Sequence, residues 1–143
     1  MKACLAIAIA SLLLTSCGST KSDPEQQFEK MMTGATMVGY STGSTPQGLS
    51  NEERYNIQKV TKLGGETWLF QTRMHFGSHD LPLPVPVTIK WAGDTPVITL
   101  TDVSLPGLGT FTARVLLYRD QYAGTWSGHG AGGQLFGKII HEH

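Results

Sequence analysis

The chain has 143 residues, with 11 basic and 11 acidic side chains and a formal net charge of zero when histidine is neutral. This length fits one domain preceded by a targeting segment. Only 15% of the residues are charged, so no basic surface indicates nucleic-acid binding and none is expected. The 17 glycines are typical of short strands joined by tight turns.

The first residues have a different composition from the rest of the chain. Lys2 supplies a positive charge, and residues 3–14 form an apolar run interrupted only by Ser11. The run is shorter than the roughly 20 residues that span a bilayer, but it fits the apolar region of a signal peptide. It ends in Leu14-Thr15-Ser16-Cys17, which resembles the lipobox of bacterial lipoproteins. The alternative is the signal peptide of a soluble protein with a chance cysteine.

The lipobox resemblance implies a covalent modification of Cys17. Its thiol would take a diacylglyceryl group, the chain would be cut before it, and the new amine would be acylated. We therefore expect a signal peptide at 1–16, an acylated tether at 17–22 and a folded domain at 23–143. In Gram-negative lipoproteins an Asp after the cysteine indicates retention in the inner membrane. Gly18 at this place favours the outer membrane, with the domain facing the periplasm.

A short helix is expected directly after the tether. Asp23 is a good N-cap, and Pro24 suits the first helical position. Gly34 is a natural helix stop. The apolar residues between them fall on one face of a helix, namely Phe28, Met31 and Met32. The sequence therefore predicts a helix of two or three turns that covers one end of the domain.

After Gly34 the apolar residues alternate with polar ones, which is typical of strands with one face on a core. We expect strands at 35–42, 53–63, 66–76, 85–92, 95–103, 110–119, 121–128 and 133–140. Most are joined by short turns such as Gly93-Asp94, so the neighbours are antiparallel. The predicted fold is all-β, an eight-stranded antiparallel up-and-down barrel with one short N-terminal helix.

One segment conflicts with this pattern. Leu81-Pro82-Leu83-Pro84-Val85-Pro86 has proline at every second position. Proline has no N–H group, and alternate N–H groups of a strand point to the same side. All the missing donors therefore fall on one side. We expect the segment to run past the sheet and pairing to begin near Val87.

No motif indicates an enzyme, a metal or a cofactor, and none of these is predicted. Residues 128–133 spell G-x-G-x-x-G, but a strand pattern follows where a dinucleotide site needs a helix. They are expected to form a turn. His75, His79 and Asp80 lie close in sequence, but their spacing on a strand and a turn does not force them to converge as zinc ligands. Surface histidines are the simpler interpretation.

The helix and strands at 23–140 resemble the lipocalin-like (calycin) barrels of small bacterial lipoproteins. Thr125-Trp126-Ser127-Gly128 is also similar to a stretch of the avidin family, another eight-stranded barrel. Such a barrel is just wide enough to be filled or to hold one small ligand. Two functions stay open: binding of a small apolar molecule or acyl chain, or a structural, protein-interaction role in the envelope with a filled interior. The candidate ligand-binding residues are aromatic: Tyr55, Trp68, Phe70, Trp91, Phe111 and Trp126.

Overall fold

The computed structural model of the protein describes residues 23–142. The predicted signal peptide, Cys17 and the tether lie outside the described residues. The elements follow in chain order: α1 (Pro24–Met32), β1 (Ala35–Ser41), β2 (Glu53–Gly64), β3 (Thr67–Phe76), β4 (His79–Ala92), β5 (Thr95–Leu105), β6 (Gly109–Tyr118), β7 (Gln121–Gly128) and β8 (Ala131–Ile140).

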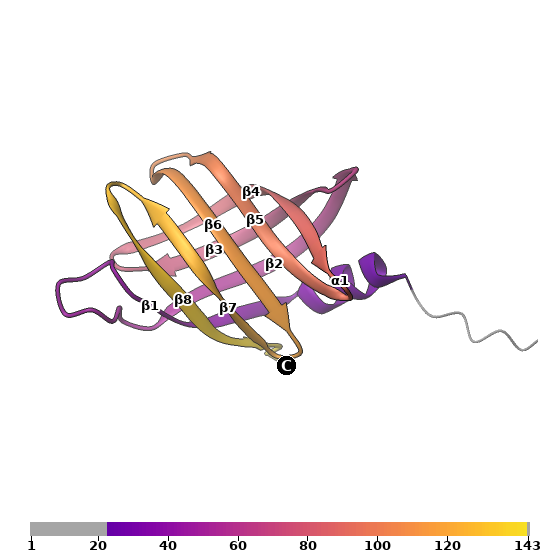
Figure 1. Ribbon diagram of the computed structural model, residues 1–143, viewed down its shortest axis with the longest axis horizontal. Helices are drawn as coiled ribbons and strands as arrows, with labels where there is room; N and C mark the ends of the chain where they lie inside the picture. Colours follow the sequence, from indigo (N-terminus) through magenta and orange to yellow (C-terminus); the bar gives the residue numbers. More distant parts are fainter. Residues whose placement is uncertain (1–22, 143) are drawn as a thin grey trace, which may run out of the picture.

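The eight strands form a closed barrel (Figure 1). Each strand pairs antiparallel with the next, and β1 also pairs with β8 from Thr36↔Ile140 to Ser41↔Leu135. The predicted fold class is therefore confirmed: an all-β, up-and-down barrel of eight strands with one short helix. The alternation of apolar and polar residues places one face of each strand inside the barrel.

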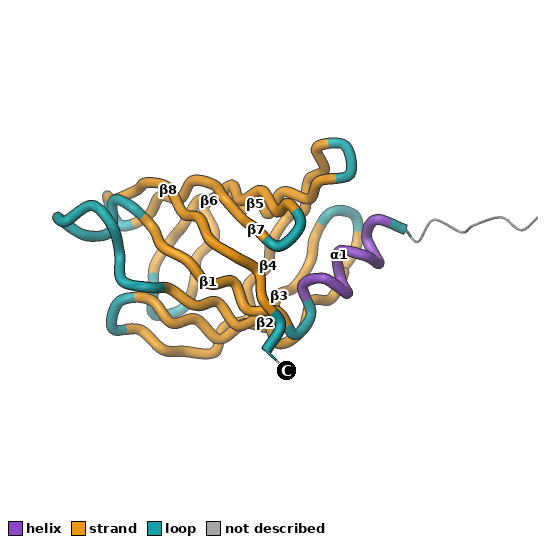
Figure 2. The backbone as a smooth tube through the Cα atoms, turned by 90° about the horizontal axis from the view of Figure 1, so that it is seen from below, coloured by secondary structure: helices purple, strands orange, loops and turns teal. Residues whose placement is uncertain are grey.

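The helix α1 lies at one end of the barrel, and the loop between β1 and β2 lies at the other (Figure 2). The Asp23 carboxylate accepts a hydrogen bond from the Glu25 N–H at 3.0 Å and caps the helix as expected. Phe28 is buried, and its ring centroid lies 5.2 Å from that of Trp68 and 6.1 Å from that of Trp91. The apolar face of α1 therefore closes this end. No helix within residues 23–142 has the length and hydropathy needed to cross a membrane.

The prediction for the proline-rich segment is wrong. β4 pairs with β3 over His79–Thr88, from Phe76↔His79 to Thr67↔Thr88, and this stretch includes all three prolines of the segment. The non-proline residues keep their polar groups on the β3 side: the carbonyl of Leu83 accepts a hydrogen bond from the Thr72 hydroxyl at 3.0 Å. A ladder on that side needs no donor from a proline, so the segment joins the sheet.

The missing donors affect the other side of β4 instead. Pro82, Pro84 and Pro86 alternate with the residues that bond to β3, so they face β5. Pairing between β4 and β5 is confined to Thr88–Ala92 on β4 and Thr95–Thr99 on β5. The prolines therefore explain why β4 and β5, which are 14 and 11 residues long, pair over only a short stretch.

Glycines allow the β1, β7 and β8 wall to curve sharply. A Cβ atom on Gly124 would lie 1.9 Å from the carbonyl oxygen of Arg114 on β6, and one on Gly39 would lie 2.0 Å from that of Phe136 on β8. No side chain fits at such distances. The backbones of neighbouring strands approach each other where a side chain would otherwise stand, as at other tight bends of barrels.

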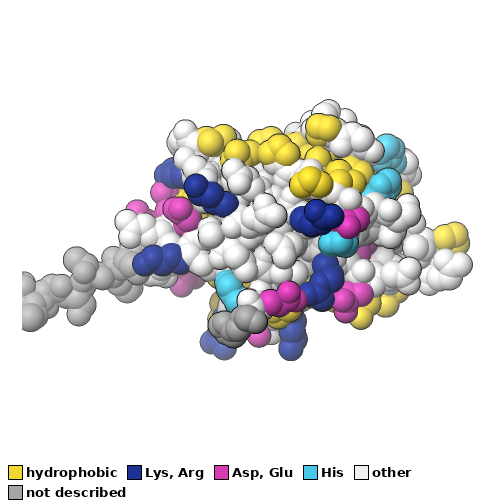
Figure 3. Space-filling model, turned by 180° about the vertical axis from the view of Figure 1, so that it is seen from behind, with side chains coloured by type: hydrophobic (Ala, Val, Ile, Leu, Met, Phe, Trp, Pro, Cys, Tyr) yellow, Lys and Arg dark blue, Asp and Glu magenta, His cyan; other side chains and the backbone are white. Residues whose placement is uncertain are grey.

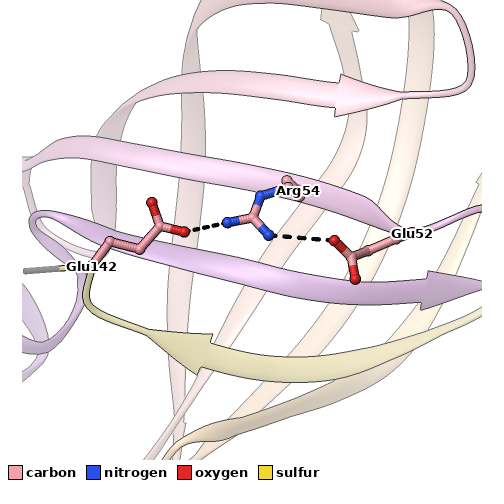
Figure 4. Close-up of polar contacts among 3 residues, drawn as sticks. All are labelled: Glu52, Arg54 and Glu142. Atoms are coloured by element: carbon pink, nitrogen blue, oxygen red, sulfur yellow. Dashed lines mark hydrogen bonds and ion pairs between the residues drawn. The ribbon is translucent and has the colours of Figure 1, made fainter.

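The outer surface is mixed in charge. Figure 3 shows acidic and basic side chains interspersed on one face, with hydrophobic side chains gathered along its upper edge. On β2, Arg54 forms ion pairs with Glu52 and with Glu142, which follows β8 (Figure 4). These side chains are exposed, so the pairs add little to stability. They do, however, hold the Arg54 guanidinium on the outside of the barrel.

Candidate functional site: a cavity inside the barrel

The barrel is not solidly packed. It encloses a cavity of about 600 Å³, within the range of about 300–1,000 Å³ typical of small-molecule sites. All eight strands contribute to the lining, which is mostly apolar. Central lining residues include Met37, Ile57, Val87, Ile98 and Val115. A void of this size with such walls suits an apolar guest.

The cavity reaches the end of the barrel opposite α1. Ser44 of the β1–β2 loop, His79, Gly107 and His129 belong to the loops and strand ends at that end, and all line the cavity. Phe28 and Trp68 are buried at the other end and do not line it. The cavity therefore has a floor covered by α1 and a mouth among the turns at the end opposite α1.

The structure separates the nominated aromatic residues into two groups. Those that line the cavity are Tyr55, Phe70, Phe111 and Trp126. Trp68 and Trp91 contact Phe28 and belong to the closed end. The alternation along a strand predicts which side chains point inward, but it does not say how far along the barrel axis they lie.

Hydrogen bonds fix Trp126 in the wall. Its indole N–H donates to the carbonyl oxygen of Thr42 at 3.0 Å. The opposite residue on β8 is Gly133, where a Cβ atom would lie 2.3 Å from the same Thr42 carbonyl oxygen, so glycine is needed there for Thr42 to approach. Near the mouth, the His129 ring bonds to the carbonyl of Leu108 and lies 5.6 Å from the Phe111 ring. The mouth is thus ordered by specific contacts.

One charged residue points into this apolar space, and the sequence reasoning missed it. Glu53, the first residue of β2, is 7% exposed and lines the cavity. Its Oε1 accepts a hydrogen bond from the Ser41 hydroxyl at 2.7 Å, and its Oε2 accepts one from the Tyr55 hydroxyl at 2.7 Å. In the sequence, Glu53 alternates with Tyr55 and Ile57 as one inward-facing row of the predicted strand. A carboxyl group in such a row is unusual, so this alternation could have identified Glu53.

The environment of Glu53 raises the pKa values of two neighbouring tyrosines, Tyr55 and Tyr122. Burial raises the pKa of Tyr55 far above that of a free tyrosine, and the negative charge of Glu53 and its hydrogen bond raise it further. Burial also raises the pKa of Tyr122, with Glu53 again contributing. Both hydroxyls therefore stay protonated, and Tyr55 remains a hydrogen-bond donor to Glu53.

The other candidate motifs have structural roles. His75 and Arg73 lie on the outside of β3 beside Asp80, with His75 Nε2 3.3 Å and Arg73 Nε 2.8 Å from Asp80 Oδ1. The hydrogen bond from Arg73 lowers the pKa of the Asp80 carboxyl. Within residues 23–142, no group of three or more His, Cys, Asp or Glu side chains could hold a metal ion. The glycine motif forms the turn at His129–Gly130 between β7 and β8.

Comparison with known proteins identifies no relative. No protein-family model matches the chain, and neither a curated protein nor a solved structure matches it. The lipoprotein and lipocalin-like resemblances therefore remain proposals, while the eight-stranded barrel is a structural result.

Proposed function

We propose that the protein is a membrane-anchored lipoprotein of the cell envelope whose barrel binds a small apolar molecule or an acyl chain. The observation that carries this proposal is the apolar cavity of about 600 Å³. Side chains that line an empty cavity lack van der Waals contacts on one side, and an apolar ligand that enters the cavity supplies these contacts. Because α1 covers the floor, a ligand would enter from the end opposite α1.

The anchor at Cys17 fits this geometry. The folded domain begins with α1 at the closed end of the barrel. Residues 18–22 would span about 17 Å if fully extended, at roughly 3.3–3.6 Å per residue. A chain acylated at Cys17 would hold the closed end near the membrane surface, here proposed to be the outer membrane on its periplasmic side, and direct the mouth away from it.

Native mass spectrometry of the protein purified gently from its own cells tests the binding function. The expected spectrum contains a species heavier than the acylated chain, and organic extraction releases the added mass as an apolar compound. A spectrum with only the ligand-free chain, together with no uptake of 1-decanol, would contradict the proposal.

Metabolic labelling with a fatty acid tests the anchor separately. Cys17→Ser is expected to remove the label and to release the protein from membranes or leave it unprocessed, because the lipoprotein peptidase requires the modified cysteine. The lipobox interpretation fails when a serine variant without its signal peptide still sediments with membranes.

A second candidate function is a protein-interaction module of the envelope. It is favoured by a row of apolar side chains across the outside of five strands. The row follows the strand register: Tyr40, Phe136, Ala123, Leu116 and Val97. The rings of Tyr40 and Phe136 lie 6.4 Å apart and are exposed. Crosslinking in cells should then trap a partner protein, and recovery of the monomer alone counts against this function.

A further inference from the structure

We infer that the cavity selects amphiphiles with a positively charged head group, and that Glu53 binds this head as a primary ammonium. The inference rests on the proposed function, because it requires that the cavity binds an apolar chain. It adds the chemical class of the ligand. Free fatty acids, which carry a carboxylate head, are expected to be rejected.

Glu53 lies at one end of the cavity, and apolar residues line the rest. It is the first residue of β2, at the end of the barrel opposite α1, where residues of the turns line the cavity. Ile57 and Phe70 line deeper parts of the wall and are both buried. A ligand with its chain against these residues would place its head beside Glu53 and the mouth. Polar and apolar parts of an amphiphile thus match polar and apolar parts of the cavity.

The carboxylate of Glu53 can accept more hydrogen bonds than Ser41 and Tyr55 donate to it. Each carboxylate oxygen accepts one hydrogen bond, from Ser41 and from Tyr55 respectively. A carboxylate offers about four lone-pair sites, so about two sites remain. A primary ammonium has three N–H donors and can fill them. The Tyr55 phenol holds the carboxylate in place, because burial keeps its hydroxyl protonated.

Within residues 23–142, Glu53 has no lysine or arginine beside it as a counter-ion. Among the described lining residues of the cavity there is no lysine and no arginine. Arg54, the next residue along β2, points outward to Glu52 and Glu142 (Figure 4). The other titratable lining groups are the imidazoles of His79 and His129 near the mouth and the Tyr55 phenol. The negative charge of Glu53 is therefore stabilised by hydroxyl groups and not by a protein cation.

A buried charge without a counter-ion has a strong effect on what binds next to it. Electrostatic interactions are stronger in an apolar interior than in water. An ammonium placed beside Glu53 supplies the missing opposite charge, whereas a carboxylate adds a second negative charge. Hydrogen bonds to charged groups contribute more than neutral ones. We therefore expect the head group, and not the chain alone, to decide which amphiphile binds.

Isothermal titration calorimetry with three ligands of equal chain length tests the inference. The 143-residue chain carrying Cys17→Ser, which prevents acylation, is titrated at pH 7 with decylammonium, decanoate and 1-decanol below their aggregation concentrations. We expect 1-decanol to bind, decylammonium to bind about tenfold tighter or more, and decanoate to bind weaker than 1-decanol. The neutral alcohol reports the cavity, and the two ions report the head-group preference.

Glu53→Gln removes the charge and keeps the shape of the side chain. It is expected to abolish the preference for decylammonium over decanoate. Glu52→Gln is the matched control, because Glu52 is the preceding residue, carries the same charge and lies outside the barrel. It should keep the full preference.

The outcomes separate the two claims. Binding of 1-decanol with equal affinities for the two ions overturns the head-group inference and leaves the proposed function intact. An unchanged preference in Glu53→Gln overturns the role of Glu53. No binding of any of the three ligands overturns both claims. The wild-type comparison of the three ligands decides the preference even where the glutamine variant does not fold.

Discussion

Truncation of Phe28 to alanine tests whether α1 is part of the fold or an accessory. The Phe28 ring is 2% exposed and contacts the rings of Trp68, Phe70 and Trp91, with centroid distances of 5.2, 6.1 and 6.1 Å. Phe→Ala substitutions in well-packed cores reduce the free energy of unfolding by about 3–5 kcal/mol. A hollow of about 310 Å³ already lies beside Phe28, so water can reach the vacated space and soften the loss. We therefore expect the lower limit, about 3 kcal/mol.

Urea denaturation followed by tryptophan fluorescence measures this loss. Gln26→Ala is the matched control, because Gln26 lies on the exposed face of the same helix and alanine keeps the helix propensity. It should change the free energy of unfolding by less than about 0.5 kcal/mol. A loss below about 1 kcal/mol for Phe28→Ala would refute the view that α1 completes the core.

Three further predictions concern the wall and the interior. Gly124→Ala should lower the free energy of unfolding by at least about 2 kcal/mol, since the added Cβ would lie 1.9 Å from the Arg114 carbonyl oxygen; urea denaturation measures it. Burial raises the pKa of both Tyr55 and Tyr122, so their contribution to stability is complete below the pKa of an unfolded tyrosine, about 10, and is lost as the pH rises above it. The double variant with phenylalanine at both positions should lose less stability between pH 9 and about 11 than the parent protein, measured by denaturation at each pH. Ala113→Phe fills part of the cavity from β6 and should weaken 1-decanol binding about tenfold or more while the circular dichroism spectrum is retained.

Each of these predictions has a result that contradicts it. A stable Gly124→Ala variant would show that the strands can separate without cost. An alkaline stability loss unchanged in the double tyrosine variant would show that these phenols do not control it. Undiminished binding of 1-decanol in the Ala113→Phe variant would place the alcohol outside the cavity.

The barrel could be predicted from the sequence because each strand and turn is indicated by residues that are close together in the chain. Period-two alternation, short turns and sequential hairpins identify eight antiparallel strands without knowledge of any distant contact. The proline segment shows the limit of this reasoning. The pattern correctly indicates that the missing donors of Pro82, Pro84 and Pro86 share one side. It does not reveal that β3 bonds to the opposite side, because that depends on pairing.

The site could be predicted only in part. Trp68 and Phe70 both point inward from β3, yet only Phe70 lines the cavity, because α1 closes the barrel at the level of Trp68. Glu53 was missed for a related reason. Its partner Ser41 lies on β1, before a long loop, and no spacing rule connects the two. The position along the barrel axis and the contacts across strands are properties of the tertiary structure.

The central claim is that an apolar chain occupies the interior of the barrel, and methionine methyl groups report on this directly. Met37 and Met74 line the cavity, whereas Met32 is fully buried beside the closed end. The measurement is an NMR experiment on protein labelled with carbon-13 at its methionine methyl groups, in which contacts to bound 1-decanol are detected as intermolecular nuclear Overhauser effects. We predict effects from the decanol chain to Met37 and Met74 and none to Met32. Saturating 1-decanol that produces no effect at Met37 or Met74 would contradict the account.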